Sequence, residues 1–159
     1  MSYDSRPETV KHSRRVGELI GLYVRSLWER SLNHDVSKME EPELSVFNEY
    51  TPKLKDSTYG SGEYKGFLVG MGAGLQHHYA VNRHHPEHFS NGVMGMTLVD
   101  VMEMLADWKA ATERMDNGSL AKSLLIQKTR FELSDQLYAI LVNTALSYGW
   151  IAEEDIVWP

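Results

Sequence analysis

The chain has 159 residues and a formal net charge of −6, a size that fits one soluble domain and a charge that argues against general affinity for nucleic acid. It contains no cysteine, which excludes disulfides and thiolate metal sites. Its apolar stretches are far shorter than the roughly 20 residues that span a bilayer, and its N-terminus lacks the apolar segment of a signal peptide. We therefore expect a single cytoplasmic domain over residues 1–159, with no membrane partner.

The first helix is predicted over about residues 7–31, where Val16, Leu19 and Tyr23 recur at helical intervals. His12 lies on the same face of this helix, so its imidazole should point inward rather than toward water. An inward imidazole needs a hydrogen-bond partner or a metal ion. A core histidine held by a hydrogen bond is the plainer alternative, and His12 alone does not decide between the two.

A second helix should begin at Pro42 and break near Pro52, because proline has no backbone N–H and restricts the residue before it. The polar segment 53–62 is then a loop and a candidate lid. No strand pattern is evident in the rest of the chain, and the helical spacing there predicts four further helices, over 63–84, 97–114, 119–131 and 134–149. The expected fold class is all-α, a single-domain bundle of about six helices.

Directly after the first helix, His34 and Asp35 place an imidazole next to a carboxylate. Such a pair can bind one metal ion, or bridge two ions through the carboxylate. A His-Asp dipeptide also occurs by chance in many chains of this length, so its value depends on what the fold brings to it.

All seven histidines lie before residue 89, and four of them form the doublets His77-His78 and His84-His85. His78 and His85 are two helical turns apart, so one face of the predicted helix should carry both. His77 and His84 form a second pair about 100° away, and only one pair can face a given site. The pair His78 and His85 is favoured because Leu75 shares its stripe, although an exposed polar helix end is an alternative.

Glu103 and Asp107 lie four residues apart on a predicted helix, where like charges repel by a few tenths of a kcal/mol. A nearby cation would remove that cost, and a solvated acidic face is the alternative. Together with the histidines these carboxylates suit one or two divalent transition metals, namely Mn, Fe, Co, Ni or Zn. Magnesium, which prefers fewer imidazoles, is an option only in the second position.

The order of these segments resembles the HD superfamily of metal-dependent phosphohydrolases. More closely, it resembles an uncharacterised family of small phage and bacterial proteins that combines HD-x-S-K, H-x-x-x-N-x-H-H and E-x-x-x-D-W segments. The resemblance covers about residues 8–115. The segments that carry it are Lys11-His12-Ser13-Arg14-Arg15-Val16, His34-Asp35-Val36-Ser37-Lys38, His78–His85 and Glu103–Trp108 with Leu105-Ala106-Asp107.

The resemblance implies an all-α bundle with the metal site among its central helices, and hydrolysis of a phosphate ester such as a nucleotide. In this hypothesis Asp35 bridges or binds the metals, Lys38 binds a phosphate oxygen as a point charge, and Glu103 orients a water. Asn82 and Arg83 would contact phosphate or support the ligands. A lysine at position 38 stands where the small 5′-deoxynucleotidase branch has a glutamate, which weakens assignment to that branch. The metal ligands implied are His12, His34, Asp35, His78, His85 and Asp107.

Three alternatives remain open from the sequence: a di-iron oxygenase on the same scaffold, a non-catalytic binding module stabilised by metal, and a helical protein without metal. The substrate, the identity and number of the metals, and the inward member of each histidine doublet are open as well. So is the oligomeric state, with a homo-oligomer among the options.

Overall fold

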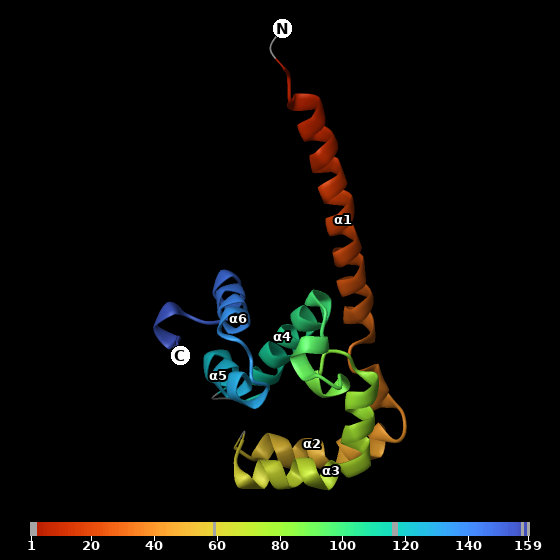
Figure 1. Cartoon of the computed structure of the whole chain (residues 1–159). Coiled ribbons are helices and arrows are strands. Elements are labelled where there is room, and N and C mark those ends of the chain that lie inside the picture. Colours follow the sequence, from red (N-terminus) through yellow and green to blue (C-terminus); the bar gives the residue numbers. More distant parts are fainter. Residues whose placement is uncertain (1–2, 59, 116–117, 157, 159) are drawn as a thin grey trace. The chain divides into compact units, whose positions relative to one another are not determined.

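The computed structural model describes residues 3–58, 60–115, 118–156 and 158, and all regular secondary structure in these ranges is helical. The prediction of an all-α fold with six α-helices is therefore confirmed (Figure 1). None of the described helices combines the length and apolar character that crossing a bilayer requires. In chain order the elements are α1 (Arg6–Asn33), the 3-10 helix η1 (Val36–Met39), α2 (Glu43–Asp56), α3 (Gly62–Val81), η2 (Pro86–His88), η3 (Gly92–Gly95), α4 (Leu98–Thr112), α5 (Leu120–Arg130), α6 (Asp135–Ser147) and η4 (Glu153–Asp155).

The chain divides into two units, Met1–His34 and Asp35–Pro159. The first unit is built on α1, and the second holds the other five α-helices. The expectation of one domain over the whole chain stays a prediction.

Helix α1 runs for 28 residues and is slightly longer at both ends than predicted. None of its residues is buried, and the apolar side chains of Leu19 and Tyr23 are 40% and 56% exposed. His12 is exposed as well. Within the first unit no other element packs against this face, and the inward orientation of His12 stays a prediction.

In the second unit, α2 and α3 pack along each other (Figure 1). A Cβ atom added to Gly74 would lie 2.7 Å from a methyl carbon of Val46, so the close approach of the helices depends on glycine there. Helix α2 continues through Pro52, and the predicted break is wrong because one proline can be accommodated inside a helix. The connection to α3 is therefore shorter than the predicted loop over 53–62, of which residue 59 lies outside the described residues.

Helix α3 bends at Gly72, where φ is 47° and ψ is −122°, values that favour glycine. The helix ends at Val81 rather than near residue 84. The amide of Asn82 donates a hydrogen bond of 2.9 Å to the carbonyl of His78, and such local bonds compete with continuation of a helix. His85 consequently lies outside α3, and the prediction that it shares a helical face with His78 is wrong.

The hydrophobic core of the second unit lies among α4, α5 and α6, where Met104, Leu124, Tyr138 and Leu141 are at most 2% exposed. This packing holds α4 in place, and α4 supplies carboxylates to the site described below. Each of the three helices has an N-cap whose side-chain hydroxyl accepts a hydrogen bond from the backbone N–H three residues on: Thr97, Ser119 and Ser134.

Candidate metal centre

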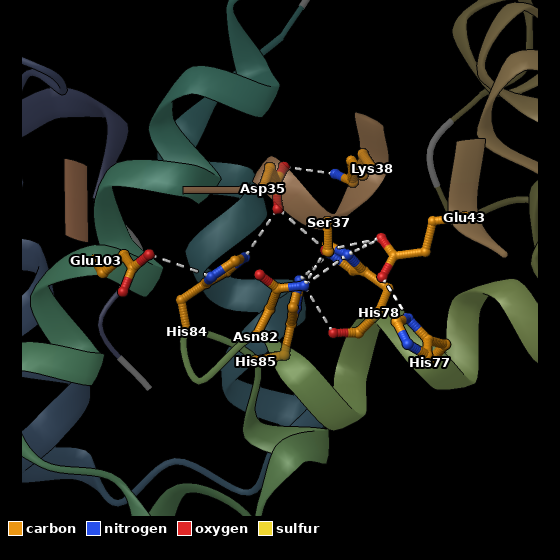
Figure 2. Close-up of polar contacts among 10 residues, drawn as sticks. All are labelled: Asp35, Ser37, Lys38, Glu43, His77, His78, Asn82, His84, His85 and Glu103. Atoms are coloured by element: carbon orange, nitrogen blue, oxygen red, sulfur yellow. Dashed lines mark hydrogen bonds and ion pairs between the residues drawn. The ribbon is translucent and has the colours of Figure 1, made fainter. Parts of the chain in front are cut away.

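Four side chains with metal-binding atoms converge in the second unit: Asp35, His78, His84 and His85 (Figure 2). One ligand atom from each lies within 4.8 Å of the others. His78 Nε2 is 2.9 Å from His85 Nε2 and 3.4 Å from Asp35 Oδ1, and His84 Nε2 is 3.5 Å from the same oxygen. Three imidazoles and one carboxylate therefore gather around a common point, and we call these four residues the histidine cluster.

The backbone of Asp35 adopts a left-handed conformation, with φ 58° and ψ 13°, at the start of η1. For a residue other than glycine this conformation costs about 1–2 kcal/mol, although aspartate tolerates it better than most. The two oxygens of its carboxylate have different neighbours: Oδ1 faces His78 and His84, while Oδ2 is 2.5 Å from Lys38 Nζ. Residues held in such a conformation are often found at functional sites.

A buried carboxylate that the sequence pattern did not predict lies behind His78. Glu43, in the first turn of α2, is 0% exposed. Its Oε2 accepts hydrogen bonds from His78 Nδ1 at 2.8 Å and from the Ser37 hydroxyl at 3.0 Å, and its Oε1 is 2.8 Å from His77 Nδ1. A glutamate in the first turn of a helix is an ordinary favourable placement, so nothing in the sequence marked it.

Glu43 is ionised in this position. Burial alone would raise its pKa, but the hydrogen bonds from His77, His78 and Ser37 together outweigh burial and hold the pKa of Glu43 below its usual value. An ionised carboxylate can only accept hydrogen bonds, so Nδ1 of His78 must carry the proton in their shared bond.

The protonation of His78 follows from its neighbours. The side-chain nitrogen of Asn82 lies 2.8 Å from the Ser37 hydroxyl, 2.9 Å from the His78 carbonyl and 2.9 Å from His78 Nδ1. Its two hydrogens can serve the hydroxyl and the carbonyl, which leaves Nδ1 of His78 to donate its proton to Glu43. Burial, and then the positive charge of Lys38, lower the pKa of His78 in spite of the nearby acids. His78 is therefore neutral, with the lone pair on Nε2 directed into the histidine cluster, which is the state that binds metals.

His84 is backed by a carboxylate in the same way. Its Nδ1 is 3.3 Å from Glu103 Oε1 on α4, and its other nitrogen faces Asp35 (Figure 2). Asp107, one turn after Glu103, has a carboxylate oxygen within 4.8 Å of a ring nitrogen of His84. The two acids on one face of α4 thus share an imidazole as neighbour, and Glu103 contacts a histidine where a water was predicted.

The prediction that only one histidine pair can face the site is wrong. Because α3 ends at Val81, the following turn lets both His84 and His85 reach the histidine cluster. Burial, followed by the charges of His84 and His78, lowers the pKa of His85 to about 3, against the opposing effect of nearby acids. His85 is neutral at physiological pH and available as a ligand.

The two predicted ligands that precede Asp35 belong to the first unit. His34 is joined to Asp35 by a peptide bond, which keeps their Cα atoms about 3.8 Å apart. His12 is separated from the end of α1 by most of the helix, which at about 1.5 Å per residue puts it roughly 33 Å from His34. A single copy of α1 therefore does not bring His12 and His34 to one ion.

The two residues predicted to contact substrate have structural partners. Asn82 bonds to Ser37 and to the His78 carbonyl. The guanidinium of Arg83 makes two hydrogen bonds of 3.1 Å to the buried carboxylate of Asp100, which anchors the turn after α3 to α4. Neither Asn82 nor Arg83 lines the cavity beside the histidine cluster, so the phosphate contact predicted for them has no support in their positions.

The cavity beside the histidine cluster has a volume of about 860 Å³, and His78, His85 and Asp107 form part of its wall. Helix α2 contributes its C-terminal end, residues 54–56, which fall within the segment 53–62 that was predicted to be a lid. Cationic side chains outnumber the three acidic residues of the lining; they are Lys38, Lys55, Arg114, Lys122 and Arg130.

Comparison with known protein families assigns the chain to a family. A model of a family of unknown function (DUF5662) matches residues 1–147. The chain belongs to this family. No curated protein and no solved structure gives a significant match. The family match spans every segment that supplies the histidine cluster, from Asp35 to His85, and it names no activity.

The donor set fits a divalent metal ion. Neutral imidazole nitrogens and carboxylate oxygens are common ligands of transition metals. Metal-binding histidines typically donate their other ring N–H to a carboxylate, and here Glu43 and Glu103 stand at that position behind His78 and His84. The Nε2 atoms of His78 and His85, 2.9 Å apart, can share one proton in a hydrogen bond, and a cation at the common point would take the place of that proton.

Proposed function

We propose that this chain is a metal-dependent hydrolase that cleaves a phosphate ester in a small phosphorylated molecule such as a nucleotide. The observation that carries the proposal is that two members of the histidine cluster, His78 and His85, line a cation-rich cavity. Although the whole chain has a net charge of −6, five cationic residues line this cavity against three acidic ones. Such a local excess of positive charge favours an anionic ligand next to the metal ligands.

The residues that would hold one or two ions are those whose donor atoms already face one another. Mn, Fe, Co, Ni and Zn all suit this mixture of imidazole and carboxylate. A bound divalent ion makes a water a better nucleophile near neutral pH and offsets negative charge on phosphoryl oxygens. The proposed ligands are Asp35, His78, His84, His85 and Asp107, with His34 added through its peptide bond to Asp35.

Lys38 is the side chain placed to bind the phosphate. It lines the cavity, and its ammonium group contacts Asp35 Oδ2 and lies 4.7 Å from the centre of the Phe47 ring. An ammonium group held between a metal ligand and an open cavity can bind a phosphate oxygen as a point charge. Elsewhere in the lining Trp108 and Phe131 have parallel ring planes, 1° apart, and aromatic residues in the lining favour a ligand with an aromatic base.

The test uses full-length protein purified without a histidine tag, analysed for bound metal and then assayed with each of the five metals. Phosphorylated metabolites, deoxynucleotides and cyclic nucleotides are the substrates, and phosphate release and mass spectrometry are the readouts. We expect turnover of at least one phosphate ester. Asp35→Ala should lose both metal and turnover, whereas Lys38→Ala should keep its metal and show a raised KM or a lowered kcat.

Three outcomes would contradict the proposal. Oxygen consumption with ferrous iron, without phosphate release from any substrate, would identify an oxygenase. A tightly held metal with no turnover under any condition would identify a metal-stabilised binding module. A wild-type metal content in Asp35→Ala would show that the histidine cluster is not the site.

A further inference from the structure

The cavity beside the histidine cluster has two chemically different ends. His78, His85 and Asp107 lie at one end, which we call the metal end. Three cationic residues line the cavity away from it, each on a different helix or directly after one, and we call them the distal cations: Lys55, Arg114 and Lys122.

Two helices place distal cations at a similar distance from the metal end. Arg114 follows Asp107 by seven residues, which along α4 and the turn after it is roughly 10 Å. The ring of Phe47 packs against His78, with ring centres 5.3 Å apart. Lys55 follows Phe47 by eight residues of α2, which is roughly 12 Å.

Lys122 reaches the same end of the cavity from α5. At the C-terminal end of that helix, Arg130 bonds to Glu87 of η2, which follows His85 directly. Lys122 precedes Arg130 by eight residues, again roughly 12 Å along the helix. Helix α5 follows α4 after a short connection and packs against it, so the beginning of α5 lies near the end of α4.

The distal cations differ from the other two cations of the cavity in their charge balance. Lys38 pairs with Asp35, and Arg130 pairs with Glu87. In the part of the chain that the structure describes, no ion pair joins a distal cation to an acid. Asp56 is the one acidic side chain of the described lining on their side, so a positive excess remains there in a chain with a net charge of −6. A bound anion would remove the repulsion among these charges.

The wall between the two ends is apolar. Leu75, Met71 and Leu68 follow one another along α3, away from His78, and all three line the cavity. Ile126 of α5, one turn after Lys122, lines it as well. A ligand that reaches both ends therefore needs an uncharged middle part.

We infer that the distal cations bind a second phosphate of the substrate, which is then a small molecule with phosphates at both ends of an uncharged middle part. The inference rests on the proposed function, because the first phosphate is the one next to the metal ligands. The guanidinium of Arg114 can donate two parallel hydrogen bonds to phosphate oxygens, and the two lysines act as point charges. Three cations and Asp56 leave a formal charge of +2, which a phosphate dianion neutralises and a carboxylate does not.

The test measures by calorimetry, at low salt, how 1,6-hexanediol bisphosphate and hexyl phosphate bind the full chain, first as purified and then loaded with Zn²⁺. The two probes share one phosphate and the same carbon chain, and they differ in the second phosphate. We expect the bisphosphate to bind roughly 10–100-fold more tightly, well above the factor of about two that two equivalent ends provide. This ratio should shrink as salt is added, because salt screens charges near solvent.

The double variant Lys55→Ala/Lys122→Ala removes two distal cations and should bring the affinity ratio close to two. Lys53→Ala/Lys65→Ala is the matched control, because these lysines are also exposed, lie on α2 and α3, and are not part of the described lining. Both double variants change the net charge by the same amount, so a difference between them reports the position of the charges. The control should keep the wild-type ratio.

Equal affinity of wild-type protein for the two probes, or an equal loss of the ratio in both double variants, would overturn the inference. Phosphate release is measured in the same samples, so this failure is distinguishable from failure of the proposed function. Release from both probes with the same KM would leave the hydrolase without a second phosphate site. A bisphosphate preference that depends on Lys55 and Lys122, without phosphate release, would support the site and contradict the hydrolase.

Discussion

Glu43→Gln isolates the carboxylate behind His78 with a change of nearly identical shape. Gln retains one carbonyl oxygen, but its amide group replaces an acceptor with donors. Three groups point at the Glu43 carboxylate, namely the ring N–H of His77, the ring N–H of His78 and the hydroxyl of Ser37. One carboxamide cannot accept from donors on both sides, so at least one buried donor loses its partner.

The magnitude follows from this loss. A hydrogen bond to a charged group contributes about 1.5–3 kcal/mol, and a buried donor without a partner costs about 1–3 kcal/mol. Glu43 is 0% exposed, so water cannot substitute easily for the lost acceptor. We expect Glu43→Gln to lower the free energy of unfolding of the metal-free protein by roughly 2–3 kcal/mol. Because the carboxylate also orients the His78 ring, metal affinity should fall by roughly 10–100-fold.

The assay is urea unfolding of metal-free protein at neutral pH, followed by competition between protein and a chelating dye for Zn²⁺. Glu49→Gln is the control, since Glu49 lies on the same helix and pairs with Lys53 at the surface, with its side chain 59% exposed. This control should change stability by less than about 0.5 kcal/mol and leave Zn²⁺ affinity unchanged.

The reasoning about Glu43 fails if Glu43→Gln unfolds at the wild-type urea concentration and binds Zn²⁺ with wild-type affinity. A loss of stability without any loss of affinity would be a narrower failure. It would show that Glu43 supports the fold but does not set the orientation of His78.

Three further predictions concern packing, pH and metal removal. Gly74→Ala should destabilise the protein by about 1–3 kcal/mol, because the added carbon clashes with Val46. In the control Gly66→Ala the added carbon has nothing within 4 Å, so this variant should be neutral or up to about 1 kcal/mol more stable. Equal unfolding midpoints for the two variants would contradict this prediction. The pKa of His85 is about 3 in the folded protein and 6.5 ordinarily, so between these pH values only the unfolded chain binds this proton. The stability of the metal-free protein should therefore fall as the pH drops below 6.5, by up to about 1.4 kcal/mol per pH unit. A flat profile in urea titrations from pH 7 to pH 4 would argue against a buried neutral His85. Chelation should lower the Tm of metal-loaded protein, with the shift growing with the logarithm of free metal concentration, and it should leave the Tm of Asp35→Ala unchanged in the same scan.

The helices and their beginnings were predictable because they depend on local chemistry. Apolar residues at helical intervals, and hydroxyl caps such as Thr97 and Ser134, act over a few neighbouring residues, and both helices began where predicted. The segments rich in histidine and carboxylate could be identified in the same way. From them Asp35, His78 and His85 were predicted as ligands, and the structure brings these three together.

Contacts between distant residues were decided only by the tertiary structure. Glu43 lies 35 residues from His78 and has the appearance of an ordinary helix start until α2 packs against α3. His84 joins the histidine cluster because Asn82 bonds to the carbonyl of His78 and the helix ends early, at Val81. The spacing of apolar residues over 63–84 predicted a helix that continues to residue 84 instead. The apolar face of α1 shows the same limit, since its pattern predicts that a partner is needed but cannot say which surface provides it. Periodicity reports how a segment divides into faces, whereas the identity of a face's neighbour depends on packing across the whole chain.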